Sequence, residues 1–283
     1  MQGRRRLAAH EAYLKACELE LRAFKPGNVS IHSEGNGMTV EDFRISAKVS
    51  APCLSDPELP LGEKIFRAIE ATHNAVGCNT NLGIVLLTAP LIQAFLHRTG
   101  RSNFHDAVKY VLEKTTVADS EWVYRAIRLA QPAGLGEAPE QDIASMPTVI
   151  LLEAMRLAAH RDSVARQYIS YFSEVFDGAI PMYDSRLSLW DDEEWATVAV
   201  FLRFLARHPD SHIERKFGPA IANHVTERMR SVEAELTVAA SPKPWMEVLR
   251  DIDREFKARG INPGTSADLT VATVLAALLQ SHY

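Results

Sequence analysis

The chain has 283 residues, of which 47% are hydrophobic and 24% are charged, a composition that excludes a disordered chain and a disulfide-dependent miniprotein. It carries 31 Lys and Arg against 36 Asp and Glu, so its formal net charge is −5. Because nucleic-acid-binding proteins need a basic face for the phosphates, this balance indicates no nucleic-acid partner. An anionic ligand would have to be met by a few local cations.

The three cysteines, Cys17, Cys53 and Cys78, are far apart and form no Cys-x-x-Cys motif, which predicts reduced thiols. Charged residues follow the arginines at 4–6, so no apolar signal region is recognisable. The two most apolar stretches, 82–96 and 269–279, are shorter than the roughly 20 residues of a membrane-spanning helix. We therefore expect a cytoplasmic protein with no membrane partner.

Apolar residues recur at helical spacing along nearly the whole chain. The pattern is clearest over 7–24, 65–76, 122–129 and 198–205. Strand-like alternation is not convincing anywhere, and the sequence contains no internal repeat. We therefore predict an all-α fold of about a dozen helices, forming a single compact domain over residues 1–283.

Capping residues mark several helix boundaries. Asp119 and the serine after it are predicted to start the helix that contains Trp122, and Gln131 to end it. In the same way, Asp192 is predicted to start the next clear helix and His208 to end it.

The motifs of the common nucleotide-binding folds and of zinc and serine hydrolases are not found in the sequence. Four polar, glycine-containing segments interrupt the apolar helices instead, at 25–43, 77–83, 210–218 and 262–268. We expect a site to be built from these segments, at helix N-termini and in the connecting loops.

The first segment begins with Lys25, Pro26 and Gly27, which are predicted to end the opening helix. A glycine-containing loop then leads to Thr39 and Asp42, whose spacing is that of a capping box. A helix N-terminus behind such a loop leaves backbone N–H groups free for phosphate oxygens, and Lys25 can add a positive charge. A plain turn between two helices explains the same residues.

The second segment places Asn79, Thr80 and Asn81 directly before an apolar helix. One N-cap is enough for a helix, so three such side chains favour hydrogen bonds to a ligand, although redundant caps remain an alternative. Gly83, one turn into the helix, costs about 1 kcal/mol relative to Ala. Its presence indicates that a ligand or another helix comes close.

In the third segment, His208, Asp210 and His212 alternate in a way that does not bring three metal ligands to one side of a helix. We expect Asp210 to act as a helix cap or a magnesium ligand. Arg215 and Lys216 would reach an anion, and a solvated charged turn is the alternative.

In the fourth segment, Pro263 and Gly264 lead into the last apolar helix, and Ser266 is expected to cap it. Asp268 is predicted to lie in the first helical turn, where a carboxylate also stabilises the helix dipole without any catalytic role. Taken alone, this segment indicates only a helix cap.

Taken together and in this order, the four segments resemble the triphosphoribosyl-dephospho-CoA synthase family. The motifs that carry the resemblance are Lys25-Pro-Gly-Asn-Val, Gly77-x-Asn-Thr-x-x-Gly83, Asp210-Ser-x-Ile-x-Arg-Lys-x-Gly218 and Asn262-Pro-Gly-x-Ser-Ala-Asp268. The resemblance implies an all-α transferase that moves the 5-triphosphoribosyl group of ATP to the 2′-hydroxyl of 3′-dephospho-CoA and releases adenine. The product is a precursor of a prosthetic group.

Such a reaction breaks the bond between C1′ and adenine through an oxocarbenium-like state, so it needs a carboxylate, a proton donor and a base. On the resemblance, Asp42, Asp210 and Asp268 are expected to act as catalytic carboxylates or Mg²⁺ ligands. If the three converge, a metal is expected to offset their repulsion. The residues expected to bind substrate or phosphate are Lys25, Gly27, Asn79, Thr80, Asn81, Gly83, Arg215, Lys216, Gly264 and Ser266.

Departures from the family pattern leave the acceptor open, because Ser30 follows the first motif and Leu82 precedes Gly83 in the second. One alternative is transfer to another alcohol, such as the precursor of a one-carbon-carrier cofactor. Others are N-glycoside hydrolysis by water and a non-catalytic helical interaction protein. ATP, 3′-dephospho-CoA or another alcohol are the expected partners, and a homodimer is the expected assembly, since it is the commonest one.

Overall fold

The computed structural model describes residues 2–35, 37–98, 103–132 and 140–283, and this part of the chain is helical without any β-strand. The predicted all-α fold is confirmed. The helices are α1 (Gln2–Arg22), α2 (Val40–Leu54), α3 (Leu61–Val76), α4 (Leu82–Leu96), α5 (Phe104–Glu113), α6 (Val117–Ala130), α7 (Leu151–Ala158), α8 (Ser163–Ile169), α9 (Ile180–Trp190), α10 (Glu193–Arg207), α11 (Ser211–Phe217), α12 (Pro219–Val238), α13 (Met246–Ala258) and α14 (Gly264–Gln280). A π-helical turn (Val175–Ala179) precedes α9, and a 3-10 turn (Lys243–Trp245) precedes α13.

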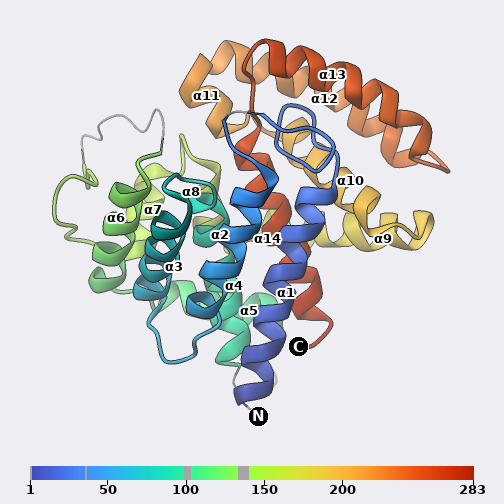
Figure 1. Cartoon of the computed structure of the whole chain (residues 1–283). Helices are drawn as coiled ribbons and strands as arrows, with labels where there is room; N and C mark the ends of the chain where they lie inside the picture. Colours follow the sequence, from blue (N-terminus) through green and yellow to red (C-terminus); the bar gives the residue numbers. More distant parts are fainter. Residues whose placement is uncertain (1, 36, 99–102, 133–139) are drawn as a thin grey trace.

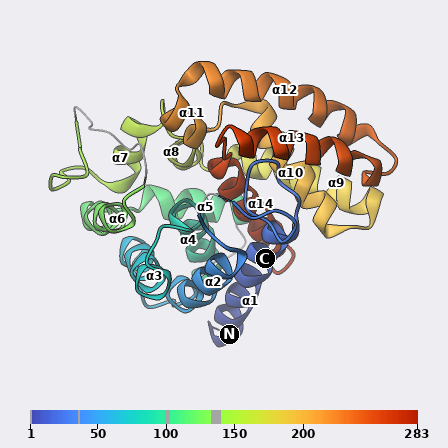
Figure 2. The same cartoon turned by 45° about the horizontal axis from the view of Figure 1, so that its top comes forward.

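Helices α4 and α14 form the centre of the molecule. Both are apolar on nearly all faces, as expected of helices that are surrounded by others. They pack against each other and against α1, while α3 packs between α2 and α6 (Figure 1). On the other side, α10 packs against α14, α9 and α12. Figure 2 shows α6 and α7 on the opposite side of this centre from α9 and α13.

The buried apolar side chains of the described residues form two large clusters and a small one. The larger cluster surrounds α4 and α14, and the second joins α10 to α11, α12 and α13. Helix α14 belongs to both, because Ala267 packs in the second cluster and Leu269 in the first. The N-terminal turn of α14 therefore lies at the boundary between the two clusters. No helix in the described part of the chain is long and apolar enough to cross a membrane.

The boundaries predicted at Gln131, Asp192 and His208 are confirmed, but the predicted start of the Trp122 helix is wrong. The N-cap of α6 is Thr116, whose N–H and hydroxyl donate to Asp119 Oδ2 at 2.8 and 2.7 Å. Asp119 thus forms the far half of a capping box inside the helix. Its other oxygen accepts the backbone N–H of Gly62, a tertiary contact that the local sequence did not predict.

Pro90 lies inside α4, where it removes the N–H that would otherwise bond to the carbonyl of Leu86. The hydroxyl of Tyr168 donates to this Leu86 oxygen at 2.7 Å, and the Tyr168 side chain is fully buried. A residue from α8 therefore satisfies the backbone group that the proline left free. This contact fixes α8 against the middle of α4.

Replacing Tyr168 with Phe is expected to leave the Leu86 carbonyl unsatisfied in the core, which should lower the free energy of unfolding by about 1 to 3 kcal/mol. Urea denaturation of the two proteins measures this difference. Tyr183→Phe is the matched control, because the buried hydroxyl of Tyr183 has no partner among the described residues and should cost nothing to remove. Equal effects of the two substitutions would contradict this account.

Candidate active site

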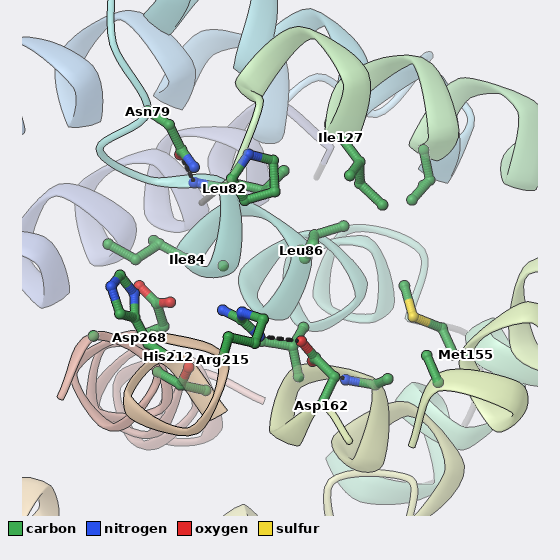
Figure 3. A pocket seen from close by; sticks show the side chains of 18 of the residues that line it. Asn79, Leu82, Ile84, Leu86, Ile127, Met155, Asp162, His212, Arg215 and Asp268 are labelled. Carbon is green, nitrogen blue, oxygen red and sulfur yellow. Dashed lines mark hydrogen bonds and ion pairs between the residues drawn. The ribbon is translucent and has the colours of Figure 1, made fainter. Parts of the chain in front are cut away.

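A cavity of about 730 Å³ opens where the N-terminal ends of α4, α11 and α14 face α6, α7 and α8. The polar side chains along its wall include Glu20, Asn28, Asn79, Asp162, His212, Arg215, Asn262 and Asp268. The apolar side chains include Leu86, Val123, Ile127, Leu151, Met155 and Val164. Figure 3 shows His212 and Asp268 at one side of the cavity and Ile127 and Met155 at the other. The site therefore has a polar part and an apolar part.

Asp268 projects from α14 into the polar part of the cavity. It is the fifth residue of the helix, so the expectation that it lies in the first turn and stabilises the dipole is wrong. Among the described residues, this carboxyl group has no hydrogen-bond or ion-pair partner. Burial raises the pKa of Asp268 well above its usual range, and the nearby Glu20 and Asp210 carboxylates raise it further. These conditions favour a protonated Asp268.

Gly83 on α4 lies directly against Asp268. A Cβ atom at position 83 would overlap the Asp268 carboxylate, so only glycine leaves room for this group between α4 and α14. The sequence predicted that another helix or a ligand comes close at Gly83, and the helix is α14. A similar contact occurs at Gly264, where a Cβ atom would lie 2.9 Å from Nδ1 of His212.

Asp210 joins α11 to α14. Its Oδ1 accepts the N–H groups of His212 and Ile213 at 2.9 and 3.2 Å, which confirms Asp210 as the N-cap of α11. Its Oδ2 accepts the N–H and the hydroxyl of Ser266 at 2.7 and 2.8 Å. The expectation that Ser266 caps α14 is wrong, because the helix begins two residues earlier, after Pro263. Asp210 and Ser266 do not line the main cavity.

Arg215 lines the cavity, whereas Lys216 does not. The Arg215 guanidinium donates from Nη1 to Asp162 Oδ2 at 2.8 Å, and its buried Nε–H has no partner in the described part of the chain. Lys216 is exposed and donates to the carbonyl of Gly260 at 3.2 Å. Burial lowers the pKa of His212, which favours its neutral form, although the Asp210 carboxylate opposes this shift. The structure thus places one of the two predicted anion-binding cations in the cavity.

Lys25 is buried behind the cavity wall rather than within the cavity. Its ammonium donates to the carbonyl oxygens of Glu20, Ala23 and Val29 at 2.5, 3.2 and 3.0 Å. It also lies 3.1 Å from Oε1 of Glu20, whose side chain does reach the cavity. Burial lowers the pKa of Lys25 and raises that of Glu20, and each charge partly reverses the shift of the other.

Gly27 shapes the loop that follows α1. It adopts a positive φ of 82°, and a Cβ there would lie 2.7 Å from the carbonyl oxygen of Ile261. The Gly27 N–H donates to Oδ1 of Asp253 at 2.8 Å, which holds the loop on α13. Nδ2 of Asn28 donates to Oδ1 of Asn262 at 2.7 Å, and both side chains line the cavity. Gly27 itself does not.

The three polar residues before α4 have different surroundings. Oδ1 of Asn79 accepts the N–H of Leu82 at 3.1 Å, and Asn79 lines the cavity together with Thr80. Asn81 does not line the cavity; its Nδ2 donates to Oγ1 of Thr72 at 3.1 Å within the core. Asn79 and Thr80 therefore lie where ligand-binding groups are expected, and Asn81 does not.

Asp42 and Thr39 form the capping box that the sequence predicted. Asp42 Oδ2 accepts the Thr39 N–H and hydroxyl, both at 2.8 Å, and these bonds hold the pKa of Asp42 below its usual range. Asp42 does not line the cavity, so the structure does not bring it together with Asp210 and Asp268. Within the residues that the structure describes, no three His, Cys, Asp or Glu side chains are grouped as metal ligands.

Several cavity residues were not selected from the sequence. They are Glu20, Asn28, Asp162 and Asn262, together with His212, which was weighed only as a metal ligand. Asn28 and Asn262 belong to motifs already singled out, so their position beside Lys25 and Gly264 was a usable signal. Glu20 offered none, because α1 carries several glutamates and only packing shows which one faces the cavity.

A family model for ATP:dephospho-CoA triphosphoribosyl transferase (CitG) matches residues 6–283 of the sequence. No curated protein matches the sequence. A crystal structure assigned to a triphosphoribosyl-dephospho-CoA synthase from Archaeoglobus fulgidus superposes with a TM-score of 0.66 at 24% identity, covering 83% of this chain and 97% of that one. At this identity the likeness supports the fold alone.

The contact between Gly83 and Asp268 can be tested by a double-mutant cycle. Gly83→Ala alone should lower the free energy of unfolding by about 1 to 3 kcal/mol, because the new methyl group displaces the carboxylate. In an Asp268→Ala background the same change should cost nothing or stabilise α4, since Ala is the better helix former. Gly3→Ala, whose Cβ would meet no atom within 4 Å, is the control. An equal cost in both backgrounds would contradict the contact.

Proposed function

The chain belongs to the ATP:dephospho-CoA triphosphoribosyl transferase family, and on this premise we propose that it transfers the 5-triphosphoribosyl group of ATP to the 2′-hydroxyl of 3′-dephospho-CoA with release of adenine. Membership in this family of transferases overturns the alternative of a non-catalytic interaction protein. The observation that carries the proposed chemistry is the partly buried Asp268, which has no partner among the described residues and faces a large cavity that also contains Arg215.

Arginines of the cavity are suited to the triphosphate. The buried Nε–H of Arg215 has no partner among the residues that the structure describes, and Arg161 lies at an exposed part of the same wall. A guanidinium binds phosphate oxygens with two parallel hydrogen bonds, which fixes the position of the chain of phosphates. We infer that Arg215 exchanges part of its contact with Asp162 for the phosphate group.

Magnesium is proposed as part of the substrate, carried on the triphosphate. The three aspartates expected to hold the ion do not fit this role as a set, because only Asp268 lines the cavity and both oxygens of Asp210 already accept hydrogen bonds. Mg²⁺ binds phosphate oxygens and water readily and needs few protein ligands.

The bond between C1′ and N9 breaks with its electron pair moving to adenine, so the departing base must gain a proton. A protonated Asp268 can supply that proton, because its surroundings disfavour the carboxylate form. The acceptor hydroxyl then forms the new C1′–O bond and loses its proton to a base. Apolar side chains such as Leu86, Ile127 and Met155 offer a surface for a nucleobase or for the acceptor.

The proposed activity is tested by measuring adenine release from ATP and Mg²⁺, with and without 3′-dephospho-CoA. We expect adenine to appear only when the acceptor is present, in equal amount to a triphosphoribosyl adduct detected by mass spectrometry. Adenine release that is independent of the acceptor would instead show hydrolysis by water. Absence of adenine in both mixtures would contradict the proposed function.

Asp268→Asn is expected to lower kcat by about 100-fold to 10,000-fold, because an amide cannot transfer a proton to adenine. The variant should also be more stable than the wild type at pH 8. A carboxyl group with a raised pKa in the folded state stabilises the protein at acidic pH and loses that contribution as the pH rises through the raised pKa. The stability gain should therefore shrink as the pH is lowered.

Thermal melts between pH 5 and 8, combined with the adenine assay, measure both effects. Asp251→Asn is the control, since Asp251 is exposed and pairs with Arg254 one turn away. Full activity of the Asp268 variant, or a stability difference that does not change with pH, would refute the proposed proton donor.

A further inference from the structure

We propose that Glu20 is the second catalytic carboxylate of this site, the anionic group that faces C1′ and accepts the proton of the attacking hydroxyl. This inference rests on the proposed function. It assigns a role to a residue that none of the sequence motifs contains, and it separates the proton donor from the proton acceptor.

Glu20 occupies the last full turn of α1 and is 4% exposed, yet its side chain reaches the same cavity as Asp268. Helical spacing allows Glu20, but not the nearby Glu18, to reach the cavity. Glu18, two residues earlier, points to a different face of α1 and forms an exposed ion pair with Arg44. A carboxylate buried this deeply is normally paired or functional, because burial penalises its charge.

Lys25 is the ion-pair partner of Glu20, and backbone carbonyl groups hold it in place. Three carbonyl oxygens, those of Glu20, Ala23 and Val29, surround its ammonium group, which lies 3.1 Å from Glu20 Oε1. The ammonium cannot swing into the cavity without giving up all of these contacts. Lys25 therefore acts on the cavity through Glu20, as a fixed positive charge behind a carboxylate.

Glu20 and Asp268, two of the carboxyl groups that line the cavity, have different electrostatic surroundings. Burial raises the pKa of both groups, but the Lys25 ammonium partly reverses this shift at Glu20, whereas Asp268 has no ion-pair partner among the described residues. The negative charge of Glu20 also raises the pKa of Asp268. These surroundings favour a proton on Asp268 more strongly than on Glu20, which is the division of roles that acid–base catalysis requires.

The proposed step balances in atoms and charge. The C1′–N9 bond breaks, its electron pair goes to adenine, and Asp268 donates a proton to the leaving base. The Glu20 carboxylate stabilises the positive charge that develops at C1′ and then takes the proton of the acceptor hydroxyl as the C1′–O bond forms. One proton has passed from Asp268 into adenine and one from the acceptor to Glu20, and exchange with solvent restores both groups.

Glu20→Gln is expected to lower kcat for adenine release at least about 100-fold, while the affinity for Mg-ATP, measured by calorimetry, changes less than about threefold. The pH dependence of kcat/KM should lose its acidic limb, because the group that must be ionised is gone. Glu18→Gln is the matched control on the same helix and should keep wild-type activity and pH dependence.

Glu20→Gln leaves Lys25 buried without its counter-ion, which can destabilise the fold by itself. The double variant Glu20→Gln with Lys25→Met removes both charges and should recover the melting temperature of the wild type. If Glu20 is catalytic, this stable variant remains inactive, and formate should partly restore turnover to a Glu20→Ala variant. A stable double variant with wild-type turnover would overturn the inference.

The outcomes also separate this inference from the function on which it rests. A wild-type protein that releases no adenine in the presence of 3′-dephospho-CoA contradicts both. A wild-type protein that makes the triphosphoribosyl adduct, together with an active double variant, leaves the function standing and reduces the pair to a structural role.

Discussion

The Asp210 carboxylate is the contact on which the geometry of the site depends. It caps α11 with one oxygen and holds the first turn of α14 with the other, so four donors converge on one buried group. Helix α11 carries His212 and Arg215, and α14 carries Asp268. Removing the carboxylate would leave several buried N–H groups without an acceptor, a larger penalty than the loss of one bond. Asp210, which does not line the cavity, therefore fixes the distance between Arg215 and Asp268 within it.

A second buried ionic group, the Lys25–Glu20 pair, also connects a structural contact to the cavity. Its ammonium closes the loop after α1 through backbone carbonyls, and its carboxylate forms part of the cavity wall. Buried ion pairs seldom add net stability, because desolvation offsets the attraction between the charges. The presence of such a pair in the same cavity as Asp268, an acid without a partner in the described part of the chain, is more readily explained by function than by stability.

Several residues of the motifs also form contacts that position the helices around the site. Gly27 allows the loop to pack on α13, Gly83 makes room for Asp268, and Ser266 donates to Asp210. Asn81 is bonded within the core, where its Nδ2 reaches Thr72. Of these four residues, only Gly83 itself lines the cavity. A motif in this chain thus encodes the positions of several helix ends as well as groups that line the cavity.

The sequence by itself determined the all-α fold, several helix boundaries, the family resemblance and the close approach at Gly83, because these depend on local periodicity, capping and backbone space. It also selected Arg215 and Asp268. Only the tertiary structure decided that Asp42 lies away from the cavity, that Lys25 is sealed behind it, and that Glu20 faces it. The physical reason is that capping boxes and loop turns depend on neighbouring residues in the sequence. Which face of a helix borders the cavity depends instead on which other helices cover its remaining faces. The burial and pairing of Glu20 and Asp268, which decide their protonation, arise only from that packing.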